Sequence, residues 1–483
     1  MIAKVIARRR GVRLRLVSVG RLRAQMGVLQ YLSAVFLHLL GNSIGSWLRT
    51  SRPGISPSKM VAASPPHDRL FGTHEEGIML LDDALAMIES MPEGIDTENY
   101  NKLSGLICRT EEISDLNRID PFSADYRARS EALYRRISAR SDYSPERDET
   151  SKIDSEAADI WRTASPFGFK STKFVSEFLI SWGAIFDALD MKEGQSVLEY
   201  GPGSGQALLM LARTGIQAHG VDIDGEGLKL LRRQSEAMGL DVSLEQAEFG
   251  YGFDGKKFDR ILFFEAFHHA INFDSVALKL HDKLLPGGKI VLCGEPIVGT
   301  GERSVPYPWG PRMDALSILC MRRYGWMELG FHLDFLVEAL MRCGWLVTQR
   351  PSPVFRAVTY VLEPIGDTIP IGGAILLPSG WSSGEGTHRW TVAETAFVPL
   401  PATPATGVRT IEIGVVNHLP VQKTVHIECG NAVEVVTLSS GQSQTIVLHG
   451  TSAPRLQFKT NLMKPRGETR DLGVAVTYVR LNS

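Results

Sequence analysis

The sequence is poor in cysteine and carries almost no net charge. Its 483 residues include five cysteines, an odd number, and none of them stands in a C-x-x-C pair. This spacing argues against a disulfide framework and against a zinc site, and it fits a reducing cytoplasm. The 52 basic and 54 acidic side chains leave a formal net charge of -2. Since no global field draws the chain to nucleic acid, we expect no nucleic-acid partner.

The sequence also lacks a hydrophobic run long enough to be a clear membrane span. Residues 1–67 contain no acid, and arginines such as Arg8 and Arg23 precede an apolar stretch at 28–40. That stretch is short for a transmembrane helix, and the basic part is longer than in a usual secretory signal. We predict a disordered extension, with Met60 as the true translation start. A membrane-surface anchor and a cleaved signal are the alternatives, so membrane contact is expected only through this segment.

The strongest functional signal is a glycine-rich segment near the middle of the chain. The apolar stub Val197-Leu198 ends on Glu199 and continues as Tyr200-Gly201-Pro202-Gly203-Ser204-Gly205. Alternating glycines let the backbone turn sharply and approach a ligand, and residues 207–212 have the composition of the helix that follows. A strand, a glycine-rich turn and a helix in this order predict a site for a nucleotide-like ligand.

A second acid follows about twenty residues beyond the glycines, as in nucleotide-binding folds. Residues 215–222 are predicted to form a short strand that ends at Asp222, whose carboxylate could accept hydrogen bonds from both ribose hydroxyls. Glu199 precedes the loop, where it would repel a pyrophosphate and attract a cationic amine. Together the two acids favour S-adenosylmethionine over NAD.

Four ordered motifs between about Gln195 and Pro296 resemble those of class I S-adenosylmethionine-dependent methyltransferases of the type 11 and type 12 kind. They are E-x-G-x-G-x-G at 199–205, G-V-D-I-D at 220–224, the strand 258–264 followed by E-A-F-H-H, and L-L-P-G-G-K-I-V-L at 284–292. The resemblance implies an α/β fold, with a Rossmann-like seven-stranded methyltransferase domain over residues 151–362.

The resemblance also implies a cofactor site. In the family the glycine loop contacts the methionine end of the cofactor, the acid matching Asp222 binds the ribose, and later segments flank the adenine. The implied residues are Glu199, Gly201, Gly203, Gly205, Asp222, Ile223, Gln246, Ala247 and Glu265. Many members carry an acid where this chain has Gln246, so the adenine contact is left open among Gln246, Ala247 and Glu248.

Three side chains are candidates for the chemistry. Methyl transfer from a sulfonium needs mainly positioning, but a hydroxyl acceptor also benefits from a base that removes its proton. His268 and His269 follow the predicted strand 258–264 at the edge where ligands bind, so either could be that base, or one could simply bond backbone. Glu295 ends the next predicted strand and is either a base or substrate ligand, or an acid that fixes the following loop.

The acceptor atom is predicted to be oxygen. After the strand 258–264 the chain has no Asn or Asp followed by Pro-Pro-Tyr or Pro-Pro-Phe, so a resemblance to methyltransferases that act on adenine or glutamine nitrogen is not supported. Scattered acids and histidines give no convincing metal constellation, so we expect no metal.

The segment at about 296–332 is a candidate substrate lid, rich in aromatics, prolines and arginines. Tyr307 and Trp309 could stack on a sugar face, and a phosphate or carboxylate could be bound by Arg312, Arg322 or Arg323. The alternative is an ordinary connection that prolines stiffen and aromatics pack down.

The region before the central domain has apolar residues at helical spacing. Residues 68–150 are predicted to form a helical module and a charged linker, which serve as a scaffold or a dimerisation surface. The aromatics that follow either line the pocket or, as we favour, pack in the core. They are Phe167, Phe169, Phe174 and Trp182.

Residues 363–483 alternate apolar and polar residues in short segments, as in an antiparallel β-sandwich. This region loosely resembles sandwich modules appended to bacterial polysaccharide-assembly enzymes. Trp381 and Trp390 either stack on sugar or, as we favour, anchor the core of the sandwich.

Taken together, the sequence predicts a cytoplasmic enzyme that uses S-adenosylmethionine to O-methylate a sugar hydroxyl in glycan or polysaccharide biosynthesis, with a saccharide or small molecule as its partner. One alternative is a methyltransferase for a non-glycan small molecule. Another is an inactive cofactor-binding or carbohydrate-binding assembly protein, which the intact glycine loop and Asp222 disfavour. The oligomeric state is left open.

Overall fold

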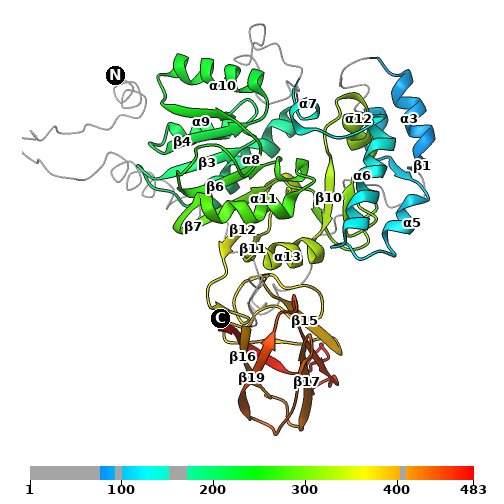
Figure 1. Ribbon diagram of the computed structural model, residues 1–483, viewed down its shortest axis with the longest axis vertical. Helices are drawn as coiled ribbons and strands as arrows, with labels where there is room; N and C mark the ends of the chain where they lie inside the picture. The colour runs from blue at the N-terminus through cyan, green and yellow to red at the C-terminus, as the bar shows by residue number, and fades with distance from the viewer. Residues whose placement is uncertain (1–76, 93–100, 152–170, 403–408, 483) are drawn as a thin grey trace, which may run out of the picture. The chain divides into compact units, whose positions relative to one another are not determined.

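A computed structural model describes residues 77–92, 101–151, 171–402 and 409–482 (Figure 1). The basic segment 1–67, Phe167 and Phe169 lie outside the described residues, so the predictions made for them stay predictions. Of the helices in these ranges, none is both long enough and apolar enough to span a bilayer.

The central domain is built on a seven-stranded sheet with the order β11-β12-β7-β6-β3-β4-β5. The strands from β5 to β7 run parallel, and β12 runs antiparallel to both of its neighbours. Their bounds are β3 Ser196–Tyr200, β4 Gln217–Asp222, β5 Val242–Gln246, β6 Phe258–Phe264, β7 Leu284–Cys293, β11 Trp345–Arg350 and β12 Thr359–Pro364.

Both faces of this sheet are buried because alternate side chains of each strand point to opposite sides. On one face Val197 and Leu262 pack with helices α8 and α9, while on the other Leu198 and Ile261 pack with α11 and α13. The helices are α8 Thr172–Leu189, α9 Gln206–Ala212, α10 Gly225–Met238, α11 Phe273–Lys279 and α13 Leu333–Arg342, with 3₁₀ turns at Phe267–His269, Leu280–Lys283 and Phe355–Ala357. Parallel strands covered on both faces form the Rossmann-like α/β fold predicted from the sequence.

The aromatic residues of α8 belong to this packing. Trp182 is buried and stacks at a tilt on Phe178, and Phe174 makes an edge contact with the same ring. Neither Phe174 nor Trp182 lines a cavity, so core packing, the interpretation that we favoured, describes them.

The region before the central domain contains helices, but it begins with a strand. Ile78, predicted to be helical, belongs to β1 (Ile78–Leu80), which pairs in parallel with β2 (Ile107–Arg109). The helices are α3 Leu81–Ser90, α5 Glu112–Leu116, α6 Ala124–Ser138 and the single turn α7 Pro145–Asp148.

Residues 296–332 fold into the protein instead of forming an open lid. They contain β8 (Ile297–Val298), β9 (Trp309–Pro311), α12 (Ala315–Arg323) and β10 (Leu329–His332), and the three strands form one sheet. Hydrogen bonds join this insertion to the N-terminal helices, including one of 2.7 Å from the Tyr126 hydroxyl to the Trp309 carbonyl. The N-terminal region is therefore packed on the insertion, which its sequence alone did not indicate (Figure 1).

The C-terminal part forms two antiparallel sheets around one apolar core. We call residues 365–482 the C-terminal β module. One sheet has β13 Thr368–Ile369, β14 Arg389–Trp390, β16 Arg409–Val416, β19 Ser443–Thr451 and β21 Ala475–Asn482; the other has β15 Thr395–Pro399, β17 Lys423–Cys429, β18 Ala432–Leu438 and β20 Arg455–Thr460.

The tryptophans proposed as sugar platforms are structural in this module. Trp390 is 6% exposed, and Trp381 donates its indole hydrogen to the Phe397 carbonyl at 2.9 Å while its ring meets Phe458 edge-on. Both side chains therefore anchor the module, which is the alternative that the sequence favoured.

Helix α13 is buried on two sides. Leu336 and Leu340 join the core of the central domain, whereas Val337 and Met341 join the core of the C-terminal β module. Between them Glu338 forms ion pairs with Arg342 and with Arg455 of β20. One helix thus contributes to two hydrophobic cores.

Candidate active site

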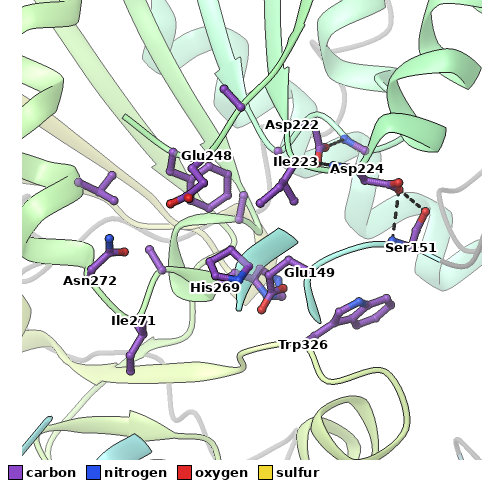
Figure 2. A pocket seen from close by; sticks show the side chains of 18 of the residues that line it. Glu149, Ser151, Asp222, Ile223, Asp224, Glu248, His269, Ile271, Asn272 and Trp326 are labelled. Atoms are coloured by element: carbon purple, nitrogen blue, oxygen red, sulfur yellow. Dashed lines mark hydrogen bonds and ion pairs between the residues drawn. The ribbon is translucent and has the colours of Figure 1, made fainter. Parts of the chain in front are cut away.

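A cavity of about 250 Å³ lies where β3, β4 and β6 end, at the carboxyl edge of the parallel strands. Strand order reverses beside β3, and such a switch point leaves a crevice for a ligand. One side, which we call the motif wall, consists of Gly201, Gly203, Asp222, Ile223 and Ala247. The composite wall, built from three separate segments, consists of Tyr143, Glu149, His269, Asn272 and Trp326 (Figure 2).

Of the three predicted glycines, Gly203 and Gly205 have different roles. All have positive φ, at 69° for Gly201, 51° for Gly203 and 74° for Gly205, a conformation that side chains with a Cβ rarely adopt. A Cβ on Gly205 would lie 2.0 Å from Leu231, so this glycine lets α9 pack closely and does not line the cavity. A Cβ on Gly203 would meet no atom within 4 Å, which leaves its backbone open to a ligand.

The two acids beside the loop are buried and close to each other. Glu199 is 2% exposed, its Oε2 has no hydrogen-bond partner, and burial together with the charge of Asp222 raises its pKa to about 8. Burial also raises the pKa of Asp222 to about 6, although its carboxylate accepts bonds from the backbone of Gly203 and Asp224 at 3.3 and 2.9 Å. An unpaired buried carboxyl of this kind is stabilised by a cation.

The last residue of β5 and the two residues after it border the main cavity or a hollow that adjoins it. Ala247 and Glu248 border the cavity, and the Ala247 amide donates to the Asp222 carbonyl at 3.1 Å. Gln246 borders only the adjoining hollow, and its side-chain amide donates to the Ile223 carbonyl at 2.9 Å. Of the three candidates for an adenine contact, Gln246 is thus the one whose side chain already bonds the backbone after β4.

Glu265 lines the cavity from the end of β6. Its φ of +51° is unusual for a residue other than glycine. Its carboxylate forms an ion pair with Arg356, yet burial keeps its pKa above the ordinary value. The structure therefore brings Glu265 to the predicted cofactor site with its carboxylate already paired with Arg356.

His268 and Glu295 form a buried ion pair outside the cavity. Glu295 accepts four hydrogen bonds, from the amides of Ala266, Phe267 and His268 at 3.0 Å and from His268 Nδ1 at 2.8 Å. Burial by itself would lower the pKa of His268, but Glu295 and Glu328 raise it to about 10. Neither side chain lines the cavity, and Glu295 accepts the amides that fix the loop, which is the alternative given for it; the catalytic roles expected for His268 and Glu295 stay predictions.

His269 faces the cavity and is paired with an acid from the N-terminal region. Its Nδ1 lies 3.1 Å from Glu149 Oε2, at ion-pair distance but without the alignment of a hydrogen bond. Glu149 is held by the Tyr143 hydroxyl at 2.9 Å and the Met327 amide at 2.6 Å, and Tyr143 contacts the His269 carbonyl at 3.1 Å. Figure 2 shows His269 and Glu149 together at the centre of the pocket. This imidazole is placed to take a proton from a bound molecule.

Behind His269 lies a network of buried charges. His268, His269 and Glu328 each bring a possible metal-ligand atom within 4.8 Å of the others, and no other such cluster occurs in the described ranges. Glu328 Oε2 is 3.7 Å from His268 Nε2 and 3.6 Å from Arg312 Nη1, and these contacts hold its pKa down at about 2 despite burial. His268 and Arg312 thus contact this carboxylate while each also pairs with a second acid, Glu295 and Asp314. The expectation of no metal stays a prediction.

The side chains expected to bind substrate from the insertion are buried in the protein. Tyr307 is fully buried and bonds the Pro311 carbonyl, and Trp309 is 1% exposed with its indole donating to the Pro121 carbonyl at 2.9 Å. Arg312 pairs with Asp314 at 2.9 Å as well as with Glu328. None of the three lines the cavity, and their burial fits the packed-connection alternative; the expected substrate role stays a prediction.

Comparison with known proteins finds a family match for the segment that carries the motif wall. Residues 198–292 match the family model described as a methyltransferase domain. S-adenosylmethionine is the cofactor expected at such a match, and the motif wall fits it: Gly203 offers an open approach and Asp222 a carboxylate at the cavity. Glu199, with its unpaired carboxyl oxygen, does not itself line the cavity.

Individual relatives share only part of the chain. Methyltransferase GfsG from Streptomyces halstedii is 29% identical over 120 residues, which are 24% of this chain and 43% of that protein. Demethylmenaquinone methyltransferase from Tropheryma whipplei is 28% identical over 105 residues, 22% of this chain and 44% of that protein. The chain therefore spans less than half the length of either curated relative.

Among solved structures, phosphoethanolamine N-methyltransferase 2 from Haemonchus contortus in complex with S-adenosyl-L-methionine has 18% sequence identity. The match covers 36% of this chain and 38% of that chain, with a TM-score of 0.28.

The composite wall contains residues that sequence reasoning did not select. Tyr143 and Glu149 fell in a segment interpreted as a linker or hinge, and Trp326 was one aromatic among many in the insertion. Asn272 follows the histidine pair by three positions and carried no signal of its own. The only usable hint was the charged, aromatic composition of residues 141–154.

Proposed function

We propose that the protein is an S-adenosylmethionine-dependent enzyme that methylates a hydroxyl oxygen, and that the hydroxyl belongs to a sugar in glycan or polysaccharide biosynthesis. The observation that carries this proposal is one continuous cavity that joins the motif wall to His269 and Glu149. A hydroxyl with a high pKa needs a proton acceptor as it reacts, and an imidazole beside the cofactor supplies one.

The cofactor, when bound, would supply an electrophilic methyl group to the acceptor oxygen, with its carbon–sulfur bond breaking and S-adenosylhomocysteine leaving. The motif wall would bind and orient it through Gly203 and Asp222, with the buried carboxyl of Glu199 adding negative charge beside Asp222. His269 takes the proton that the acceptor hydroxyl releases as the new carbon–oxygen bond forms. Glu149 Oε2 lies 3.1 Å from Nδ1 of the same ring, so its negative charge faces the ring that accepts the proton.

A second candidate is methylation of a small molecule outside glycan metabolism. One curated relative is named a demethylmenaquinone methyltransferase, and demethylmenaquinone is not a sugar. That relative favours the second candidate. A third candidate, an inactive assembly protein, is disfavoured by the intact motif wall and by His269 in the cavity.

The test begins with the full-length protein titrated with S-adenosylmethionine by calorimetry, and continues with labelled methyl donor and panels of saccharide and quinone acceptors. We expect micromolar binding and label transfer to a saccharide oxygen. Folded protein that fails to bind the cofactor would sink the methyltransferase proposal. Transfer to quinones alone would select the second candidate, and binding without transfer to either panel would select the third.

A further inference from the structure

We infer that the composite wall is the acceptor subsite and that it takes an uncharged sugar ring stacked on Trp326. This inference rests on the proposed function, because it names the substrate class of the same pocket. Two residues of the composite wall, His269 and Asn272, lie in the matched segment 198–292. The other three, Tyr143, Glu149 and Trp326, lie outside it.

Trp326 presents an aromatic surface to the cavity. The indole is half-buried, and Tyr324 stacks on it with ring centroids 4.7 Å apart and an interplanar angle of 29°. In the view of Figure 2, His269 and Glu149 lie between Trp326 and Asn272. A sugar ring has an apolar face of C–H groups and a rim of hydroxyls, so it matches one aromatic side chain flanked by polar groups.

The segment that carries Trp326 is held in place before any ligand arrives. The Tyr324 carbonyl accepts a bond of 2.9 Å from Arg140, the Gly325 carbonyl accepts one from Tyr134, and the Met327 amide donates to Glu149 at 2.6 Å. Because these partners belong to the N-terminal region, that region fixes the aromatic surface. A fixed side chain loses little conformational entropy when a weak ligand binds.

Acidic residues outnumber basic ones around the cavity. Its lining includes Glu149, Asp222, Asp224, Glu248 and Glu265, of which Glu265 is paired with Arg356 and Glu149 lies against His269. Burial and the neighbouring Glu146 raise the pKa of Glu248, as expected where negative charge is already crowded. A sugar phosphate or a hexuronate would enter against this field, whereas a neutral glycoside would not.

A cationic acceptor is disfavoured for a different reason. The sulfonium of the cofactor carries positive charge in the same cavity, so a protonated amine would be repelled by the group that it must approach. Hydroxyl groups, in contrast, can donate to Glu149 and bond to the Asn272 amide without any net charge. The uncharged sugar ring therefore satisfies both ends of the pocket.

The test compares probes that differ in charge. Full-length protein saturated with S-adenosylhomocysteine is examined by saturation-transfer NMR with the methyl glycosides of glucose, galactose and mannose and with the corresponding 1-phosphates. We expect at least one glycoside to bind more tightly than its 1-phosphate. Trp326→Ala should weaken that binding about tenfold, the upper range for an aromatic contact, and Trp326→Phe should restore most of it.

Tyr251→Ala is the matched control, since Tyr251 is 49% exposed and lies outside the cavity lining. The inference is overturned if no glycoside binds, if a 1-phosphate binds better, or if glycoside binding survives Trp326→Ala unchanged. A failure of S-adenosylhomocysteine to bind is a separate result and counts against the proposed function itself. Because cofactor binding is measured in every variant, loss of folding is told apart from loss of the aromatic contact.

Discussion

The motif wall and the composite wall enclose one cavity but arise from the sequence in different ways. The motif wall comes from successive strand ends between Gly201 and Ala247, and local spacing alone marks its residues. The composite wall joins Tyr143, His269 and Trp326, which only tertiary packing brings together. A cofactor common to many enzymes can be bound by a local motif, whereas an acceptor site has to be assembled from whatever segments surround it.

The histidine pair shows the same difference at the scale of one turn. In a 3₁₀ turn consecutive side chains point about 120° apart, since three residues complete the turn. Within Phe267–His269, His268 is therefore directed into the buried charge network while His269 reaches the composite wall. Adjacent and chemically identical residues thus have separate roles, one structural and one facing the ligand.

The largest effect is expected when the buried ion pair of His268 and Glu295, the structural side of this comparison, is broken. Glu295→Ala removes the acceptor of three amides and leaves the His268 imidazolium buried without its partner. We expect the free energy of unfolding to fall by about 3–5 kcal/mol, as for other broken buried ion pairs, in urea unfolding followed by tryptophan fluorescence. Glu363→Ala, at an exposed ion pair with Lys289, is the control and should change it by less than about 1 kcal/mol. An equal, small effect of both variants would contradict the network.

The second prediction tests the ligand-facing histidine. His269→Ala should lower kcat by about 10²- to 10⁴-fold, because the acceptor proton loses its base, while cofactor affinity stays unchanged. Steady-state rates with labelled methyl donor measure the first quantity and calorimetry the second. His449→Ala, on an exposed strand of the C-terminal β module, serves as the control. Full activity in His269→Ala would remove the imidazole from the mechanism.

The third prediction concerns the motif wall. Asp222→Ala removes a charged hydrogen-bond acceptor at the cavity, so the Kd for S-adenosylmethionine should rise by about 10- to 150-fold. Calorimetry measures it, with Asp254→Ala, an exposed acid, as the control. An unchanged Kd would mean that the cofactor bypasses this carboxylate.

The smallest effect is a pH dependence of cofactor affinity. Glu199 has a pKa of about 8 and Asp222 of about 6, and the cationic cofactor favours the ionised form of each, so binding releases protons at neutral pH. Affinity should therefore rise from pH 6 to pH 8, by up to about tenfold per pH unit for each proton, and level off above pH 8. Calorimetry in buffers of different ionisation enthalpy counts the protons, and Glu199→Gln should remove the upper part of the rise. An affinity for S-adenosylmethionine that falls as the pH rises would contradict this prediction.

The sequence was sufficient where a residue's role depends on its near neighbours. The glycine loop, Asp222 and the strands of both modules follow from local spacing and alternation. It misled where burial decides, because Tyr307 and Trp309 have the composition of a binding surface and the packing of a core. It was silent on Glu149, since an acid in a charged segment has no distinguishing pattern until α7 and the insertion place it against His269.

The two-sided burial of α13 limits how the protein can be divided. A shortened protein that ends after β12 would expose Val337 and Met341, which are 2% and 0% exposed in the full chain. It would also deprive Glu338 of its partner Arg455. Exposed apolar side chains on one helix face promote self-association. We therefore expect the central domain to stay soluble only when it is produced with the C-terminal sheets or with polar residues at these two positions.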